Sequence, residues 1–87
     1  MEHVSVHPRI HERHPEVKDS DIVVAWENFI CRTRRVDAFD DNYISVGFDS
    51  TGRLLEMAAV QKTDGSWFVF HAMPATKKAL EELGLMK

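Results

Sequence analysis

The chain has one cysteine, Cys31, so it cannot form an internal disulfide. A lone cysteine is typical of proteins kept in a reducing compartment. Its apolar runs are all shorter than the ~20 residues that a membrane-spanning helix needs. The first residues also lack the basic and apolar regions of a signal peptide. We therefore expect a cytoplasmic protein without a membrane segment.

The sequence contains neither a CxxC nor an HExxH pattern, the most specific signals for zinc. Three histidines (His7, His11 and His14) would nevertheless share one face of a helix. Two of them, with Glu12 or Glu16, could bind zinc, although exposed histidines without a metal are the more common case. We predict no cofactor and leave the metal question open.

The 87 residues suffice for one domain, residues 1–87, with a modest core. A hydrophobic fraction of 44% with 29% charged residues is typical of a folded protein. The net charge is −3, whereas a nucleic-acid-binding domain normally carries a net basic face. Any phosphate-binding surface must therefore be a local cluster.

Three helices are predicted. A short one within residues 7–14 ends before Pro15, because the residue before a proline disfavours helix. A second, over residues 20–32, has an amphipathic pattern, and a third follows Pro74 and ends at Gly84. The apolar stripe of the second helix consists of Ile22, Val23, Trp26, Phe29 and Ile30.

Three strands follow the second helix and a polar loop that extends to Asn42. The strands are Tyr43–Asp49, Arg53–Lys62 and Trp67–Met73, separated by glycine-containing turns. The predicted fold class is α+β. It has a three-stranded, possibly four-stranded, antiparallel meander with two N-terminal helices and one C-terminal helix.

Two-residue loops at Thr51-Gly52 and Asp64-Gly65 would fix the register of this meander. They pair Val46 with Met57, Ala58 with His71, Glu56 with Met73 and Val60 with Val69. One face then carries Ile44, Val46, Phe48, Leu55, Met57, Ala59, Phe68, Phe70 and Ala72. The other carries Tyr43, Ser45, Gly47, Asp49, Leu54, Glu56, Ala58, Val60, Trp67, Val69, His71 and Met73.

Glu56 and His71 are diagonal neighbours in this register, within side-chain reach. Gly47 and Ala58 beside them would leave space for a substrate. A carboxylate that orients an imidazole is the basic unit of general acid–base catalysis. A hydrogen-bonded polar pair on a half-exposed sheet, or a dimer contact, would explain the same residues.

The same face would expose an apolar patch made of Leu54, Val60, Trp67, Val69 and Met73. Exposed patches of this kind mark partner surfaces. We expect at least part of it to be covered by the C-terminal helix or by another chain, either another protein or a second copy of this one.

Six basic residues could gather at one end of the sheet and bind phosphate: Arg32, Arg34, Arg35, Arg53, Lys77 and Lys78. Solvated charges, with Lys77–Glu81 and Lys78–Glu82 pairs on the last helix, are the simpler explanation.

The layout resembles a known family. Arg13-His14 at the end of a short helix, the hairpin YISVGFDSTGRLLEMAAV and the segment HAMPATKKALEEL are together similar to the BrnT-like toxins of type II toxin–antitoxin systems, within the RelE-like fold. The resemblance covers about Arg9 to Leu83. It implies a compact ribonuclease that cleaves messenger RNA and is neutralised by a DNA-binding antitoxin.

The resemblance also carries individual positions over. The residues that match family positions are His14, Arg53, Lys77 and Lys78. Met73 stands where the family has an arginine, and Pro15 stands where it has a glycine.

Our leading hypothesis is therefore a RelE/BrnT-like toxin that cuts RNA. Its expected catalytic residues are Glu56, His71 and Arg53, and its expected substrate-binding residues are His14, Tyr43, Lys77 and Lys78. The alternative is a non-catalytic, dimeric protein-binding module of the same fold. The missing arginine at Met73 and the acidic net charge favour that alternative.

Overall fold

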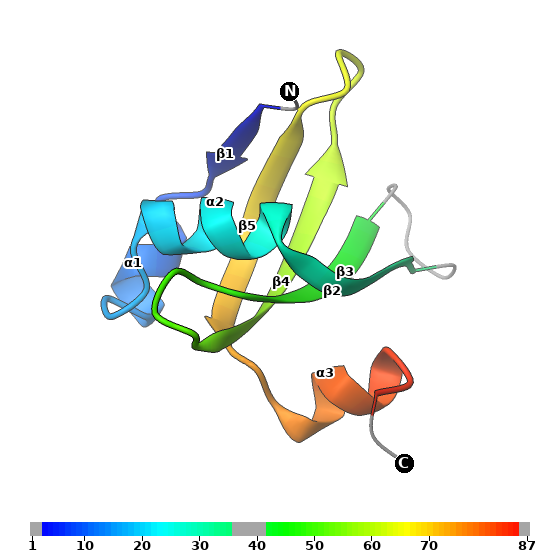
Figure 1. Ribbon diagram of the computed structural model, residues 1–87. Helices are drawn as coiled ribbons and strands as arrows, with labels where there is room; N and C mark the ends of the chain where they lie inside the picture. The colour runs from blue at the N-terminus through cyan, green and yellow to red at the C-terminus, as the bar shows by residue number, and fades with distance from the viewer. Residues whose placement is uncertain (1–2, 36–41, 86–87) are drawn as a thin grey trace.

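The computed structural model describes residues 3–35 and 42–85, which form three helices and a five-stranded mixed sheet (Figure 1). The elements are β1 (Val4–Val6), α1 (Arg9–Arg13), α2 (Asp19–Glu27), β2 (Phe29–Arg34), β3 (Asn42–Phe48), β4 (Leu54–Gln61), β5 (Trp67–Pro74) and α3 (Lys77–Glu82). The strand order is β1-β5-β4-β3-β2, with β1 parallel to β5 and the other pairs antiparallel. The α+β class and the three helices are as predicted.

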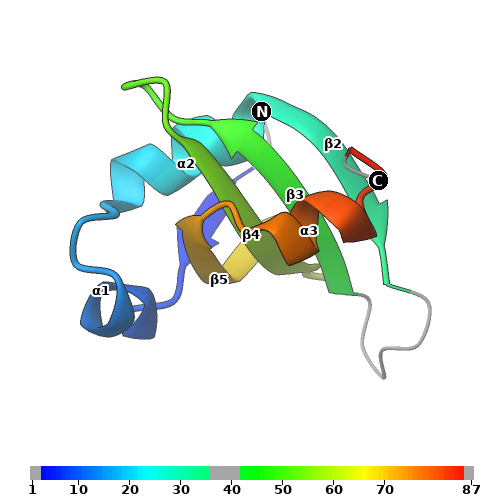
Figure 2. The same ribbon diagram turned by 90° about the horizontal axis from the view of Figure 1, so that it is seen from below.

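The helices cover the sheet from two sides. Helix α2 packs across one face, α1 lies beside β5, and α3 lies on the opposite face (Figure 2). The main core lies between α2 and the sheet and contains Ile10, Val17, Ile22, Ala25, Trp26, Leu55, Met57, Ala59, Trp67, Val69 and Ala72. None of the helices in the described ranges is long and apolar enough to cross a membrane.

The second helix is shorter than predicted. It ends at Glu27, and the Asn28 side chain donates a hydrogen bond to the carbonyl of Val24. Phe29 and Ile30, expected on the helix, instead begin the edge strand β2 and are about half exposed. Aromatic and β-branched residues favour strands, and pairing with β3 supplies the backbone hydrogen bonds that a longer helix would have made.

The sheet has five strands rather than three or four. The strand β1 has only three residues and pairs in parallel with β5, starting with Val4 opposite Trp67. Part of the expected polar loop is β2, which pairs with β3 as far as Arg34 opposite Tyr43. The remaining expected loop residues, 36–41, lie outside the described residues.

Both hairpin turns are three-residue loops, not the predicted two-residue loops. The N–H of Asp49 bonds to the carbonyl of Arg53 (2.9 Å), and the N–H of Lys62 bonds to that of Ser66 (2.8 Å). Among the described residues only glycines have positive φ, so Asp64 cannot occupy a type I′ turn. The positive φ of Gly65 (+88°) instead closes a type I turn with a one-residue bulge.

The longer first turn shifts β3 by one residue. Val46 therefore pairs with Glu56 rather than with Met57, and a shift of one residue reverses the face of every side chain. The predicted faces are wrong for all of β3. Gly47 consequently lies against α2, where an added Cβ would be 2.1 Å from the carbonyl oxygen of Ala25, and it leaves no space beside Glu56.

The longer second turn is compensated by a β-bulge in β5. Ala59 pairs with Val69 and Ala58 pairs with His71, so Phe70 is the extra residue. Beyond the bulge the predicted pairs Ala58–His71 and Glu56–Met73 are both confirmed.

Before the bulge, the predicted faces of β5 are wrong. Val60 pairs with Phe68, while Trp67 and Val69 point into the main core and are almost completely buried. The expected apolar patch is therefore divided between the two faces. Leu54, Val60 and Met73 remain on the face that α3 partly covers, and each is only partly exposed.

Candidate functional site

Glu56 and His71 form a dyad near the middle of the sheet. His71 Nε2 lies 2.9 Å from Glu56 Oε2, so the expected proximity of the two side chains is observed. An ionised carboxylate only accepts hydrogen bonds, so the imidazole donates from Nε2. When the imidazole is neutral, its Nδ1 is therefore the basic nitrogen.

The start of α3 fixes the other oxygen of Glu56. The backbone N–H of Thr76 donates to Oε1 at 2.8 Å, and its hydroxyl donates to the same oxygen at 2.5 Å. Burial of Glu56, which is 8% exposed, would raise its pKa, but the hydrogen bonds from Thr76 and His71 outweigh it and lower the pKa below its ordinary value. Glu56 is thus ionised at neutral pH and holds the imidazole in one orientation.

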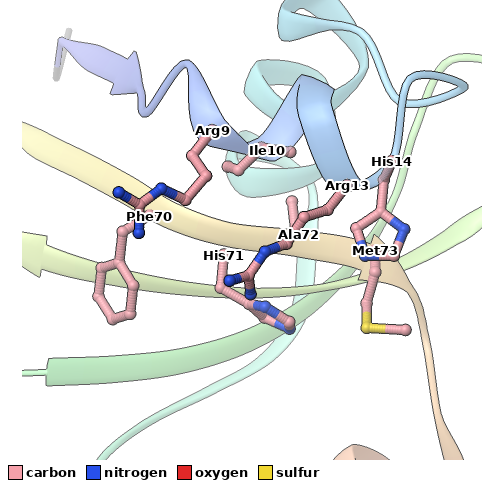
Figure 3. A pocket seen from close by; sticks show the side chains of 8 residues that line it. All are labelled: Arg9, Ile10, Arg13, His14, Phe70, His71, Ala72 and Met73. Atoms are coloured by element: carbon pink, nitrogen blue, oxygen red, sulfur yellow. The ribbon is translucent and has the colours of Figure 1, made fainter.

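The dyad opens into a groove that we call the basic groove. It consists of two adjoining hollows of about 170 and 470 Å³ that share four lining residues: Arg9, Arg13, Phe70 and His71. The first hollow adds Ile10, His14, Ala72 and Met73, and the second adds His7, Arg35 and Ala58. Figure 3 shows side chains from α1 extending over β5 toward Phe70 and His71.

Positive charge dominates the basic groove. Arg9 and Arg13 are one helical turn apart, so both side chains project from the same side of α1. Neither guanidinium forms an ion pair with a residue that the structure describes, and no described lining residue is acidic. At the far end, Arg35 is bidentate to Glu82 of α3. The groove is a locally basic surface on a chain of net charge −3.

Arg53, expected to be catalytic, does not line the basic groove. Its guanidinium contacts the carboxylates of Asp49 (3.0 Å) and Asp21 (3.3 Å) and the carbonyl of Glu16. Strand alternation places it on the face opposite Glu56. Arg53 therefore joins the first turn to the start of α2.

Three other expected residues also lie outside the basic groove. Tyr43 packs edge-on against Trp67 on the α2 side, with ring centroids 5.1 Å apart. Lys77 and Lys78 are exposed in the first turn of α3. Of the expected substrate-binding residues, only His14 reaches the groove, where it also lies 3.5 Å from Glu16.

The six basic residues that we expected to gather at one end of the sheet do not gather around the basic groove. Arg32 lies over the rings of Trp26 (3.7 Å) and Phe29 (3.9 Å) and donates to the carbonyl of Trp26. Of the six expected cations, only Arg35 lines the groove.

The cations that do line the groove include Arg9, which we had not singled out, and Arg13, which we had named only as part of the Arg13-His14 pair. Their i, i+4 spacing was visible in the sequence. The docking of α1 against β5 was not.

The three N-terminal histidines do not converge. His11 contacts Asp19 and the carbonyl of Val17, whereas His7 accepts a hydrogen bond from the backbone N–H of Arg9. Within residues 3–35 and 42–85, no group of three or more potential ligands is arranged to hold a metal ion.

Asp49 provides a stability prediction. It is buried, which would raise its pKa, but bonds from Thr51 and Arg53 lower the pKa from 3.8 to about 2. The stabilisation is present above pH 3.8 and is lost as the pH falls through about 2. We expect Asp49→Asn to lower the free energy of unfolding by about 2 kcal/mol at pH 7 and by much less at pH 2.

Urea unfolding at both pH values measures this difference. Asp64→Asn is the matched control, because Asp64 makes the same kind of turn contacts to Ser66 at an exposed site. A smaller change is expected there. An equal loss for Asp49→Asn at pH 7 and pH 2 would contradict the assignment.

Comparison of the chain with models of known families, with curated proteins and with solved structures gives no match.

Proposed function

We propose that this chain is an RNA-cleaving ribonuclease of the toxin type, with Glu56 and His71 as its proton-transfer dyad. One observation carries the proposal: a hydrogen-bonded carboxylate–imidazole pair opens into a groove lined by Arg9 and Arg13, neither of which forms an ion pair with a described residue. Arginine binds phosphate, and a positioned imidazole is the commonest general base.

The proposed reaction is cleavage by the neighbouring 2′-hydroxyl. His71 Nδ1 removes the 2′-hydroxyl proton, and the 2′-oxygen forms a bond to phosphorus. The bond from phosphorus to the 5′-oxygen breaks, and the leaving oxygen takes a proton from His14 or from water. Arg9 and Arg13 stabilise the charge that develops on the phosphate oxygens. The products are a 2′,3′-cyclic phosphate and a 5′-hydroxyl.

The toxin assignment rests on the BrnT-like and RelE-like resemblance. In its support, two of the resembling segments meet at the basic groove: Arg13-His14 from α1, and HAMPAT, which supplies His71 and Thr76. In this proposal a cytoplasmic antitoxin neutralises the nuclease. Arg53, Lys77 and Lys78 have no part in the chemistry, because other cations line the groove.

The second candidate is the non-catalytic protein-binding module. The observation that favours it is the edge strand β2, where Phe29 and Ile30 expose large apolar side chains beside a backbone edge. Exposed edges and apolar side chains are common features of partner surfaces. An antitoxin or a second copy of the chain would be the partner.

A substrate lacking one hydroxyl tests the ribonuclease proposal. We expect the purified chain to cut a short oligoribonucleotide. The same oligonucleotide with 2′-deoxyribose at the cleaved position should stay intact, because it lacks the 2′-hydroxyl nucleophile. Denaturing gel electrophoresis and mass spectrometry identify the cyclic phosphate end.

Expression without any partner is the companion experiment, with growth and transcript integrity as readouts. Arrest with cut transcripts is expected. Intact RNA with well-folded protein would exclude the nuclease and leave the protein-binding module.

A further inference from the structure

The β-bulge in β5 brings an exposed aromatic ring to the floor of the basic groove. Phe70 is the extra residue of the bulge and has no partner in β4. Phe70 and His71 are consecutive in the chain, yet both line both hollows, whereas successive residues of a regular strand would face opposite ways. Bulges of this kind re-aim side chains beside active sites.

The surroundings of Phe70 in the larger hollow are unusual for an exposed ring. Phe70 is 37% exposed, and the described residues that line this hollow with it include the cations Arg9 and Arg13 but no other large apolar side chain. Figure 3 shows Arg9 extending toward Phe70 and Arg13 toward His71. An aromatic face flanked by cations combines the two elements that single-stranded nucleic acids require, which are a stacking platform and a backbone contact.

We propose that Phe70 is a base-stacking subsite, so that the groove takes single-stranded RNA with an unpaired base on the Phe70 ring and the adjoining phosphate beside Arg13 and His71. This inference rests on the proposed function. The larger hollow, about 470 Å³, lies within the size range of small-molecule sites. A base in a duplex is stacked on its neighbours and cannot present its face to the ring.

Binding to an uncleavable probe tests the subsite without relying on catalysis. The probe is a short 2′-O-methyl oligoribonucleotide with 2-aminopurine at successive positions, in single-stranded form and annealed to its complement. Stacking quenches 2-aminopurine fluorescence, and anisotropy reports the affinity.

The variants are Phe70→Leu, Phe70→Trp and Phe48→Leu. Phe48 is a matched control because it is an exposed phenylalanine, 46% accessible, that does not line either hollow. We expect Phe70→Leu to weaken single-strand binding roughly ten-fold and to abolish quenching at one position. Phe70→Trp should retain both the single-strand affinity and the quenching. Phe48→Leu should behave as the original chain in both measurements.

The outcomes separate this inference from the ribonuclease proposal. If fluorescence quenching requires Phe70 but the chain cuts no RNA, the stacking subsite is supported and the ribonuclease proposal is excluded. Cleavage with unchanged affinity in Phe70→Leu, or duplex bound as tightly as the single strand, would overturn the subsite. Absence of any RNA binding would overturn both.

Discussion

Replacing His71 with alanine is expected to slow RNA cleavage by roughly 10²- to 10⁴-fold, which is the usual contribution of a positioned general base. The imidazole is part-exposed on the groove side and bonded to Glu56 on the other, so its removal leaves the core unchanged. Single-turnover cleavage at saturating protein measures the chemical step without the binding step.

Glu56→Gln should cause a comparable loss by a different route. The amide oxygen of the new glutamine accepts the two hydrogen bonds from Thr76, so its NH₂ group faces His71. A donor at that point makes Nε2 the acceptor and moves the proton of the neutral ring to Nδ1. The nitrogen facing the substrate then cannot accept a proton, and a wrong tautomer of this kind has a large cost in catalysis.

The effects of the two substitutions on the cleavage rate should not be additive. Residues that act as one unit lose most of their effect with the first change, so Glu56→Gln/His71→Ala is expected to be about as slow as His71→Ala alone. His3→Ala is the matched control, because His3 is exposed and lines neither hollow. A His71→Ala variant that keeps more than half of the original rate would exclude the dyad from the reaction.

The dyad could be predicted from the sequence because two departures from the expected backbone cancel. The turn at Asp64-Gly65 has one residue more than predicted, and the bulge at Phe70 absorbs it. The register between Glu56 and His71 is therefore the same as the one predicted from a two-residue loop. The turn at Gly52 has no compensating bulge in the adjoining strands, and the faces of β3 were assigned wrongly for that reason.

The strands β1 and β2 could not be predicted because their pairing is tertiary. Val4–Val6 is too short for a period to be recognised, and it becomes a strand only through its hydrogen bonds to β5. The sequence of Phe29–Arg34 continues the helical pattern of α2, and its preference for strand is decided by β3 beside it. Local pattern and global fold conflict there, and the global fold prevails.

The basic groove also could not be predicted from the sequence. The i, i+4 spacing of Arg9 and Arg13 places them on one side of α1, but only the packing of Ile10 into the core turns that side toward His71. Six other basic residues were expected to gather because helix and strand ends meet at one end of the sheet, but only Arg35 of the six lines the groove.

The largest effect on stability is expected from Gly47→Ala. A Cβ at this position would lie 2.1 Å from the carbonyl oxygen of Ala25 and 3.0 Å from both the carbonyl oxygen of Asn28 and the Cα of Phe29. All three are backbone atoms, so no side chain can rotate away, and α2 would have to move off β3. We expect a loss of about 3 kcal/mol or more.

A loss of that size is about a quarter to three quarters of the stability of a domain this small, which is roughly 4–13 kcal/mol. The melting temperature should fall by about 12–24 °C. Gly52→Ala and Gly65→Ala are the controls, since both glycines have positive φ but open space around them. They should cost only the ~1–2 kcal/mol of a left-handed alanine. A Gly47→Ala variant as stable as these two would show that α2 does not pack on β3 as closely as the structure places it, and the α2 face of β3 would need reassignment.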